Sequence, residues 1–137
     1  MVYLTLATLF SGLTFFMVKV VTTKIYPLLG NIISILVAFL VQLCIFLYFK
    51  SRGTDMHFTK EGVGVSLLVG VLVALYTFFL FLAFSKLDVS KATPILYIGS
   101  LAIATLLSVI FLGEHLKLIN WLGFVLAALS IILLLWR

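Results

Sequence analysis

Few side chains of this sequence are candidates for a binding or catalytic role. The most prominent is a single charged residue beside an apolar stretch. Lys19 is the only charged side chain within about one turn of the interior of such a stretch. A charge placed deep in a membrane is costly and therefore a candidate for function. Its ammonium could attract a carboxylate or phosphate, or pair with Glu114 of a second copy. Alternatively, the long side chain extends to the membrane surface.

Hydroxyl and aromatic side chains recur at helical spacing and could line a site for a small molecule. Tyr76, Phe79 and Ala83 fall at i, i+3 and i+7, and therefore on one helix face. A mostly apolar cavity with a few polar points is the usual make-up of such a site. Ordinary helix packing with satisfied hydroxyls is the alternative. The predicted substrate-binding residues are Ser11, Thr14, Phe15, Lys19, Tyr76, Phe79, Tyr97 and Ser100.

Other kinds of chemistry find no support in the residue pattern. The four carboxylates lie in loops or at helix ends, and the two histidines are far apart without ligand companions. We find no pairing of nucleophile and base, no glycine-rich phosphate loop and no Cys/His cluster, so we expect no metal, no cofactor and no enzyme. Cys44 is most simply a small apolar filler. Asn31 and Gln42 could form hydrogen bonds across helices.

The composition decides the class of protein. Of 137 residues, 65% are hydrophobic and 9% charged, against roughly 25% charged in soluble domains. So few charges cannot cover the surface of a short soluble chain. A soluble enzyme and a disordered chain are thereby excluded, and an integral membrane protein in contact with the lipid bilayer is expected. The net charge of +5 does not indicate nucleic acid, because the basic residues are spread over the loops.

Five uncharged stretches account for most of the chain and predict an all-α integral membrane protein with five transmembrane helices. A helix of about 20 apolar residues crosses the bilayer core, and the alternation typical of membrane strands is missing. The first stretch is not expected to be a signal peptide, since no positive residue precedes it. We expect one membrane domain over residues 1–137, with helices at residues 1–22, 28–49, 62–85, 92–113 and 118–136.

The distribution of basic residues bears on orientation. With five helices, the two termini face opposite sides. The N-terminal amine shares its side with Lys50, Arg52, Lys60 and Lys117, whereas the other side holds Lys19, Lys24, Lys86, Lys91 and Arg137. Orientation normally follows an excess of Lys and Arg on the cytoplasmic side, and here there is none. We therefore expect insertion in both orientations and an antiparallel homodimer, although a few strongly placed charges could still decide.

Small residues and helix breakers in the second half suggest an interface and a hinge. Small side chains three or four residues apart let helices approach closely, between protomers or within one. Pro94 removes a backbone hydrogen bond and could act as a hinge, while Gly113 and Glu114 form a helix stop. The predicted dimer-interface residues are Ala104, Ser108, Gly123, Ala127 and Ser130.

The second half also carries a family pattern. Ala92-Thr93-Pro94 opens the fourth stretch, Leu112-Gly113-Glu114 closes it, and Trp121-Leu122-Gly123 begins the fifth. This resembles the EamA-type domain of the drug/metabolite transporter superfamily. Most members have ten helices in two inverted halves. The resemblance implies that this chain is one half of a ten-helix inverted-repeat bundle, similar to the five-helix bacterial and archaeal branch, and that it pairs with itself or with a paralogous half.

Two departures qualify what the resemblance implies. Small multidrug exporters of the superfamily keep a Glu in the first helix, where this chain offers hydroxyls such as Thr5 and Thr8, so proton-coupled export of organic cations is not expected. The family often has a second Gly in the fifth helix, where this chain has Ser130.

The expected function is that of a secondary transporter subunit in the cell membrane of a prokaryote. It would move a small neutral or anionic metabolite by alternating access. The alternative is a non-transporting assembly or regulatory subunit, with a dimerisation face but no polar cavity, that packs against another helix bundle.

Overall fold

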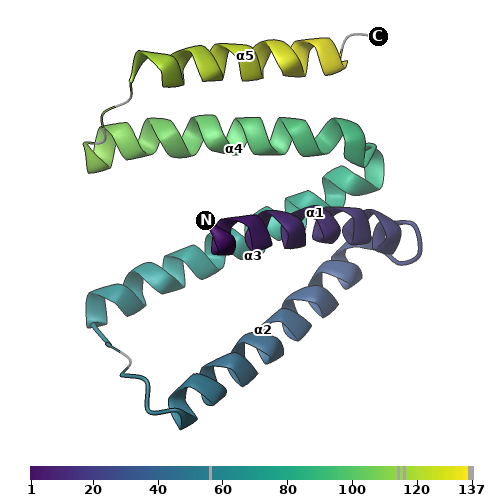
Figure 1. Cartoon of the computed structure of the whole chain (residues 1–137). Coiled ribbons are helices and arrows are strands. Elements are labelled where there is room, and N and C mark those ends of the chain that lie inside the picture. Colours follow the sequence, from purple (N-terminus) through teal and green to yellow (C-terminus); the bar gives the residue numbers. More distant parts are fainter. Residues whose placement is uncertain (56, 114, 116, 136–137) are drawn as a thin grey trace. The chain divides into compact units, whose positions relative to one another are not determined.

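The computed structural model describes residues 1–55, 57–113, 115 and 117–135, and this part of the chain is almost entirely helical. The all-α prediction is confirmed, and the helices begin and end within a few residues of the predicted positions. The five helices are α1 (Val2–Thr22), α2 (Pro27–Ser51), α3 (Lys60–Lys86), α4 (Val89–Leu112) and α5 (Leu118–Leu135) (Figure 1).

Four of these helices, α1 to α4, are long and apolar enough to cross a membrane. The apolar run described in α5, Ile119–Ser130, is shorter, so a fifth span stays a prediction. A helix pairs its backbone groups within itself, which is what a hydrocarbon solvent requires. Many large apolar side chains are exposed along every helix. Such a surface suits lipid, or another helix, rather than water.

Local sequence signals set several helix ends. Pro27 is the first residue of α2, where its missing N–H and its restricted φ angle do no harm. At the start of α3, the Thr59 hydroxyl accepts a hydrogen bond of 3.1 Å from the Gly62 N–H, which satisfies one donor of the first turn. α4 ends at Leu112 because Gly113 adopts a left-handed conformation, with φ of 66°.

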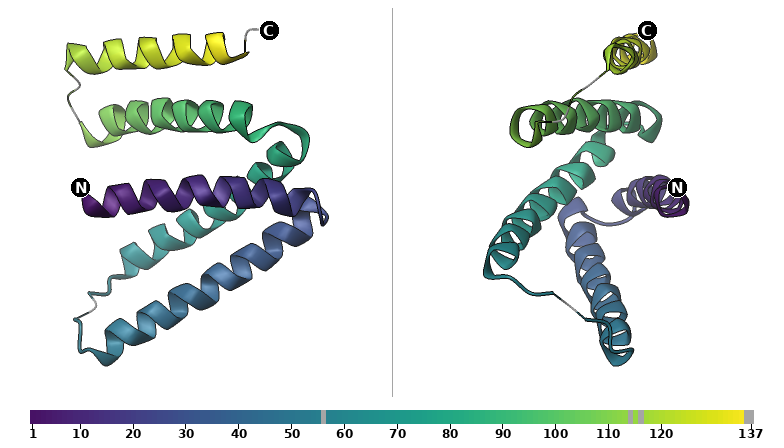
Figure 2. Two further views of the ribbon diagram at one scale, coloured as in Figure 1. Left: turned by 45° about the vertical axis from the view of Figure 1, so that its right-hand side comes forward. Right: turned by 60° about the vertical axis from the view of Figure 1, so that its left-hand side comes forward.

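The chain divides into two compact units, Met1–Lys86 and Leu87–Arg137. In the first unit, a short turn joins α1 to α2, and the two helices diverge away from it (Figure 2). The buried side chains lie where the end of α1, the start of α2 and the end of α3 meet. We call this region the apex, and its buried residues are Phe15, Val18, Gly30, Asn31, Leu80, Phe81 and Phe84.

The second unit is a pair of helices, α4 and α5, that lie side by side and run in opposite directions (Figures 1 and 2). Trp121 and Phe124 of α5 form a tilted ring pair with centroids 6.2 Å apart. With Ala102 and Thr105 of α4 they line a small, almost wholly apolar groove.

Close packing at the apex depends on a glycine. A methyl group added at Gly30 would lie 2.6 Å from Val21 Cγ1 and 2.9 Å from Phe81 Cε1. Both distances are shorter than carbon–carbon contact, so a side chain here would force Val21 of α1 and Phe81 of α3 to shift. The absence of a side chain thus lets α2 approach both neighbours.

We predict that Gly30→Ala destabilises the protein by about 1–3 kcal/mol, the usual cost of overpacking a tight contact. The measurement is thermal unfolding of the purified protein in one detergent. Gly12→Ala is the matched control, since a methyl group at Gly12 meets nothing within 4 Å. Equal unfolding temperatures for the two variants would contradict the packing described for Gly30.

Candidate functional site

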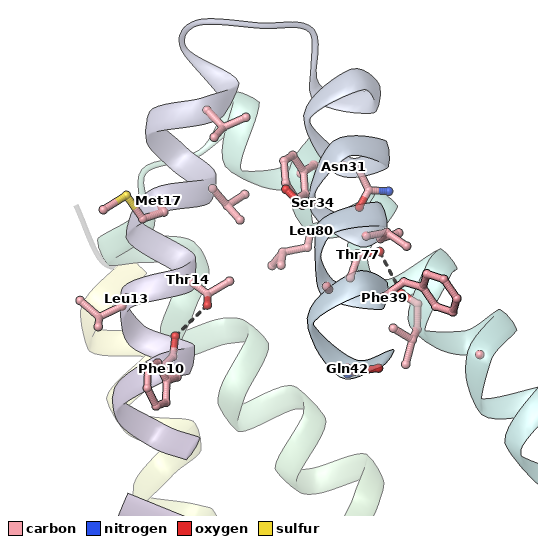
Figure 3. A pocket seen from close by; sticks show the side chains of 17 residues that line it. Phe10, Leu13, Thr14, Met17, Asn31, Ser34, Phe39, Gln42, Thr77 and Leu80 are labelled. Carbon is pink, nitrogen blue, oxygen red and sulfur yellow. Dashed lines mark hydrogen bonds between the residues drawn. The ribbon is translucent and has the colours of Figure 1, made fainter. Parts of the chain in front are cut away.

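An open groove of about 630 Å³ lies between α1, α2 and α3 of the first unit (Figure 3). Its walls are mainly apolar, with Phe10, Phe39 and Phe81 among them. Among the lining residues that the structure describes, none is charged. The polar points are Thr14 on α1, Asn31, Ser34 and Gln42 on α2, and Thr77 on α3. Size and lining both match those of sites for small molecules, which span roughly 300–1,000 Å³.

The three hydroxyl groups in the groove donate to their own helices. The bonds run from Thr14 Oγ1 to the Phe10 carbonyl (2.7 Å), from Ser34 Oγ to the Gly30 carbonyl (2.8 Å), and from Thr77 Oγ1 to the Val73 carbonyl (3.0 Å). A hydroxyl has one hydrogen and two lone pairs. With the hydrogen engaged by the backbone, each group offers acceptor capacity but no donor to the groove.

Asn31 is the most unusual polar group of the groove. Its side chain is only 4% exposed, and its Oδ1 accepts no hydrogen bond from any residue that the structure describes. The sequence suggested a bond across helices for this residue, and the structure does not provide one for Oδ1. Most buried polar atoms in proteins are paired, so this one requires an explanation.

A pattern on α2 could have identified the groove face. Asn31, Ser34, Ala38 and Gln42 fall at i, i+3, i+7 and i+11, and all four line the groove. These are successive positions on one helical face. Three of the four are polar in a helix that is otherwise almost uniformly apolar.

The residues predicted on α1 divide between two faces. Thr14 lines the groove, whereas Ser11, Phe15 and Lys19 do not. These three residues are spaced by four and share another face. Phe15 is buried against Phe84 of α3, with ring centroids 5.5 Å apart and the rings nearly perpendicular. In the structure, Phe15 therefore belongs to the apex.

Lys19 also contacts the end of α3. Its Nζ donates a hydrogen bond of 2.8 Å to the Phe84 carbonyl oxygen. That carbonyl belongs to the last turn of α3, where carbonyls have no partner within the helix and the helix dipole is negative. The ammonium therefore binds the α3 terminus that the apex buries. A substrate role for Lys19 stays a prediction, and its proposed partner Glu114 lies outside the described residues.

On α3 the predicted residues lie beside the groove face. Tyr76 and Phe79 are 47% and 62% exposed, and neither lines the groove. Thr77 does, although it is adjacent in sequence to Tyr76. One residue along a helix turns the side chain by about 100°, so this small change of position separates the two faces. Thr77 was not among the residues predicted from the sequence.

The remaining predicted residues belong to the second unit. Tyr97 is 42% exposed, and Ser100 Oγ donates to the Tyr97 carbonyl at 3.0 Å. Pro94 lies inside α4. Of the predicted interface residues, Ser108 and Ala127 are half-buried, and those that are exposed are Ala104, Gly123 and Ser130. Their roles in a dimer stay predictions.

Within the described ranges, no group of three or more His, Cys, Asp or Glu side chains could hold a metal ion. The described lining of the groove can offer a small molecule hydrogen bonds and apolar contact. The class of protein that emerges is a multi-pass helical membrane protein with a groove suited to such a molecule.

Comparison with known families agrees with this class. Residues 1–136 match the EamA-like transporter family, and the chain belongs to that family. The resemblance noted in the sequence is thereby confirmed, and the family implies a transporter-like function in a membrane. No curated protein and no solved structure shows significant similarity to the chain.

We predict that Lys19→Met lowers the free energy of unfolding by about 1–3 kcal/mol, because it removes a charged donor from a buried helix end. Thermal unfolding measures the loss, and hydrogen exchange of the last turn of α3 locates it. Lys24→Met serves as control, since Lys24 is exposed in the turn after α1. If the two variants unfold alike, Lys19 does not stabilise the α3 terminus.

Proposed function

We propose that this protein is a subunit of a secondary transporter that moves a small, uncharged metabolite across the membrane. The observation that carries the proposal is the groove of the first unit, which combines apolar walls with a buried amide, in a chain of the EamA-like transporter family. The groove is the substrate site of this proposal.

The proposed assembly is an antiparallel homodimer in the cell membrane of a prokaryote. Two copies in opposite orientations would recreate the inverted repeat on which many secondary transporters are built. The support comes from the basic residues, which with the N-terminal amine number five on each side of the predicted topology. The two halves would then expose the groove to either side in turn. Pairing with a paralogous half is the variant of this assembly.

The lining of the groove supports the choice of substrate. An organic cation would find no carboxylate among the described lining residues. Moving a charge from water into an apolar site that offers no counter-charge costs much free energy. An anion would likewise find no cationic side chain among the described lining residues. An uncharged molecule requires neither. The alternative function, a non-transporting partner subunit, would leave the groove without a role.

We predict that the orientation of the chain can be locked by removing two exposed lysines from one side. Lys60→Ala with Lys117→Ala leaves three positive groups on the N-terminal side against five on the other. The C-terminus should then lie in the cytoplasm, because the richer side stays there. Lys24→Ala with Lys86→Ala should place it outside. Alkaline phosphatase and green fluorescent protein fused to the C-terminus report the two locations.

The wild type should activate both reporters. So should Lys24→Ala with Lys60→Ala, which preserves the balance of charges and is the matched control. Reporter activity from one side only in the wild type would rule out dual insertion.

We predict that the locked variants transport only in combination. Liposomes carrying the wild-type protein are loaded with a defined mixture of neutral and anionic metabolites, and mass spectrometry identifies what leaves. Each locked variant alone should release no more than empty liposomes, because all of its copies share one orientation. Co-expression of the two variants should restore release. Full activity of either variant alone would contradict the antiparallel assembly.

A further inference from the structure

We propose that the end of α2 and the loop after it bind the headgroup of phosphatidylethanolamine, with Lys50 holding the phosphate and Asp55 the ammonium. An open pocket of about 750 Å³ lies there, at the end of α2 that is remote from the apex (Figure 1). Its lining includes Phe46 and Lys50 of α2 and Asp55, His57 and Phe58 of the loop. The site is separate from the groove, and the inference does not depend on the proposed transport function.

The pocket lies where α2 reaches the membrane surface. α2 is long and apolar enough to cross a membrane, and Lys50, in its last turn, is its first charged residue. Phe46 precedes Lys50 by four residues, so the two share a helix face and Phe46 lies about 6 Å deeper. The apolar end of the pocket is therefore directed toward hydrocarbon and the charged end toward water. A phospholipid has the same polarity.

A helix stop of defined geometry brings the loop beside Lys50. Gly53 adopts a left-handed conformation with φ of 73°. Its N–H donates to the Lys50 carbonyl at 3.1 Å, and the Thr54 N–H donates to the Phe49 carbonyl at 3.3 Å. This pair of bonds is the Schellman motif, in which glycine is the preferred residue. The motif reverses the chain, and Asp55 comes to line the same pocket as Lys50.

The charges of the pocket match an amine-bearing headgroup. Lys50 supplies an ammonium and Asp55 a carboxylate, and no ion pair joins the two in the described part of the chain. Phosphatidylethanolamine carries a phosphate close to a primary ammonium, so each side chain would meet a group of opposite charge that can share a hydrogen bond with it. The imidazole of His57 can donate a further bond to the phosphate. A headgroup without the amine would leave Asp55 without a partner.

Arg52 provides an internal comparison for Lys50. Its guanidinium lies over the ring of Tyr48, 5.2 Å from the centroid, and its Nη2 donates to the Tyr48 hydroxyl at 2.9 Å. Arg52 does not line the pocket. The same end of α2 thus carries one cation in the pocket and one outside it. This pair of residues can separate binding in the pocket from the general attraction of lipids to a basic surface.

Native mass spectrometry of the whole chain in detergent tests the proposal. The protein is mixed at pH 7 with equal amounts of dioleoyl phosphatidylethanolamine and dioleoyl phosphatidylglycerol, and the bound lipids are counted. The chain has a net charge of +5, so general attraction alone would favour the anionic phosphatidylglycerol. We expect the wild type to prefer phosphatidylethanolamine about fivefold instead, the size typical of one exposed charged contact.

Two pairs of charge variants locate the binding. Asp55→Asn should abolish the preference by weakening phosphatidylethanolamine binding alone, whereas Glu61→Gln, which removes an exposed carboxylate outside the pocket, should preserve it. Lys50→Gln should weaken both lipids about fivefold, and Arg52→Gln neither. All four side chains are exposed, so the variants should fold. As a second readout, phosphatidylethanolamine should raise the unfolding temperature of the wild type and not that of Lys50→Gln.

Soluble O-phosphoethanolamine has the same charged groups without the acyl chains, and it distinguishes a lipid from a free headgroup. It should displace phosphatidylethanolamine only in large excess, and Phe46→Ala should weaken the binding of the lipid and not that of the soluble compound. Displacement at equal concentration would overturn the assignment to a lipid. Equal binding of the two lipids by the wild type, binding of neither, or equal losses in Lys50→Gln and Arg52→Gln would overturn the site itself.

Discussion

The hydrocarbon core of a membrane cannot form hydrogen bonds with a protein, and this explains much of the structure. Backbone groups must be paired within each segment, so the described chain is built from long helices. Side-chain hydroxyl groups also need a hydrogen-bond partner. Threonines and serines along the helices therefore donate to backbone carbonyls three or four residues earlier. This local pairing fixes the chemistry of the groove, because it removes hydroxyl hydrogens and leaves lone pairs.

The apex gives the groove its shape. Phe84 is completely buried, the ring of Phe15 packs edge-on against it, and Lys19 binds its carbonyl oxygen. Gly30 lets α2 lie against Val21 of α1 and Phe81 of α3. Three helices held together at one end and diverging from it leave a space between them. The groove is thus a consequence of tight packing at the apex. A change in the packing residues would therefore also change the shape of the groove.

Family membership and the groove address different parts of the function. The match to the EamA-like transporter family implies transport across a membrane but says nothing about what is moved. The groove shows what chemistry the first unit offers: its described lining is uncharged, mostly apolar, and polar at five residues.

The helices and their limits follow from the amino-acid sequence alone. Long uncharged runs locate helices in lipid, and Pro27 and Gly113 stand at helix ends for reasons that act over a few residues. The faces of those helices were decided by tertiary structure. A side chain turned to lipid is as apolar as one turned to a core, so hydropathy cannot distinguish the Tyr76 face of α3 from the Thr77 face. Thr14 was predicted from the sequence as a site residue. The row of polar residues on α2 could have been predicted in the same way. Only the packing of three helices at the apex decides which faces enclose the groove, since that depends on contacts between residues far apart in the chain.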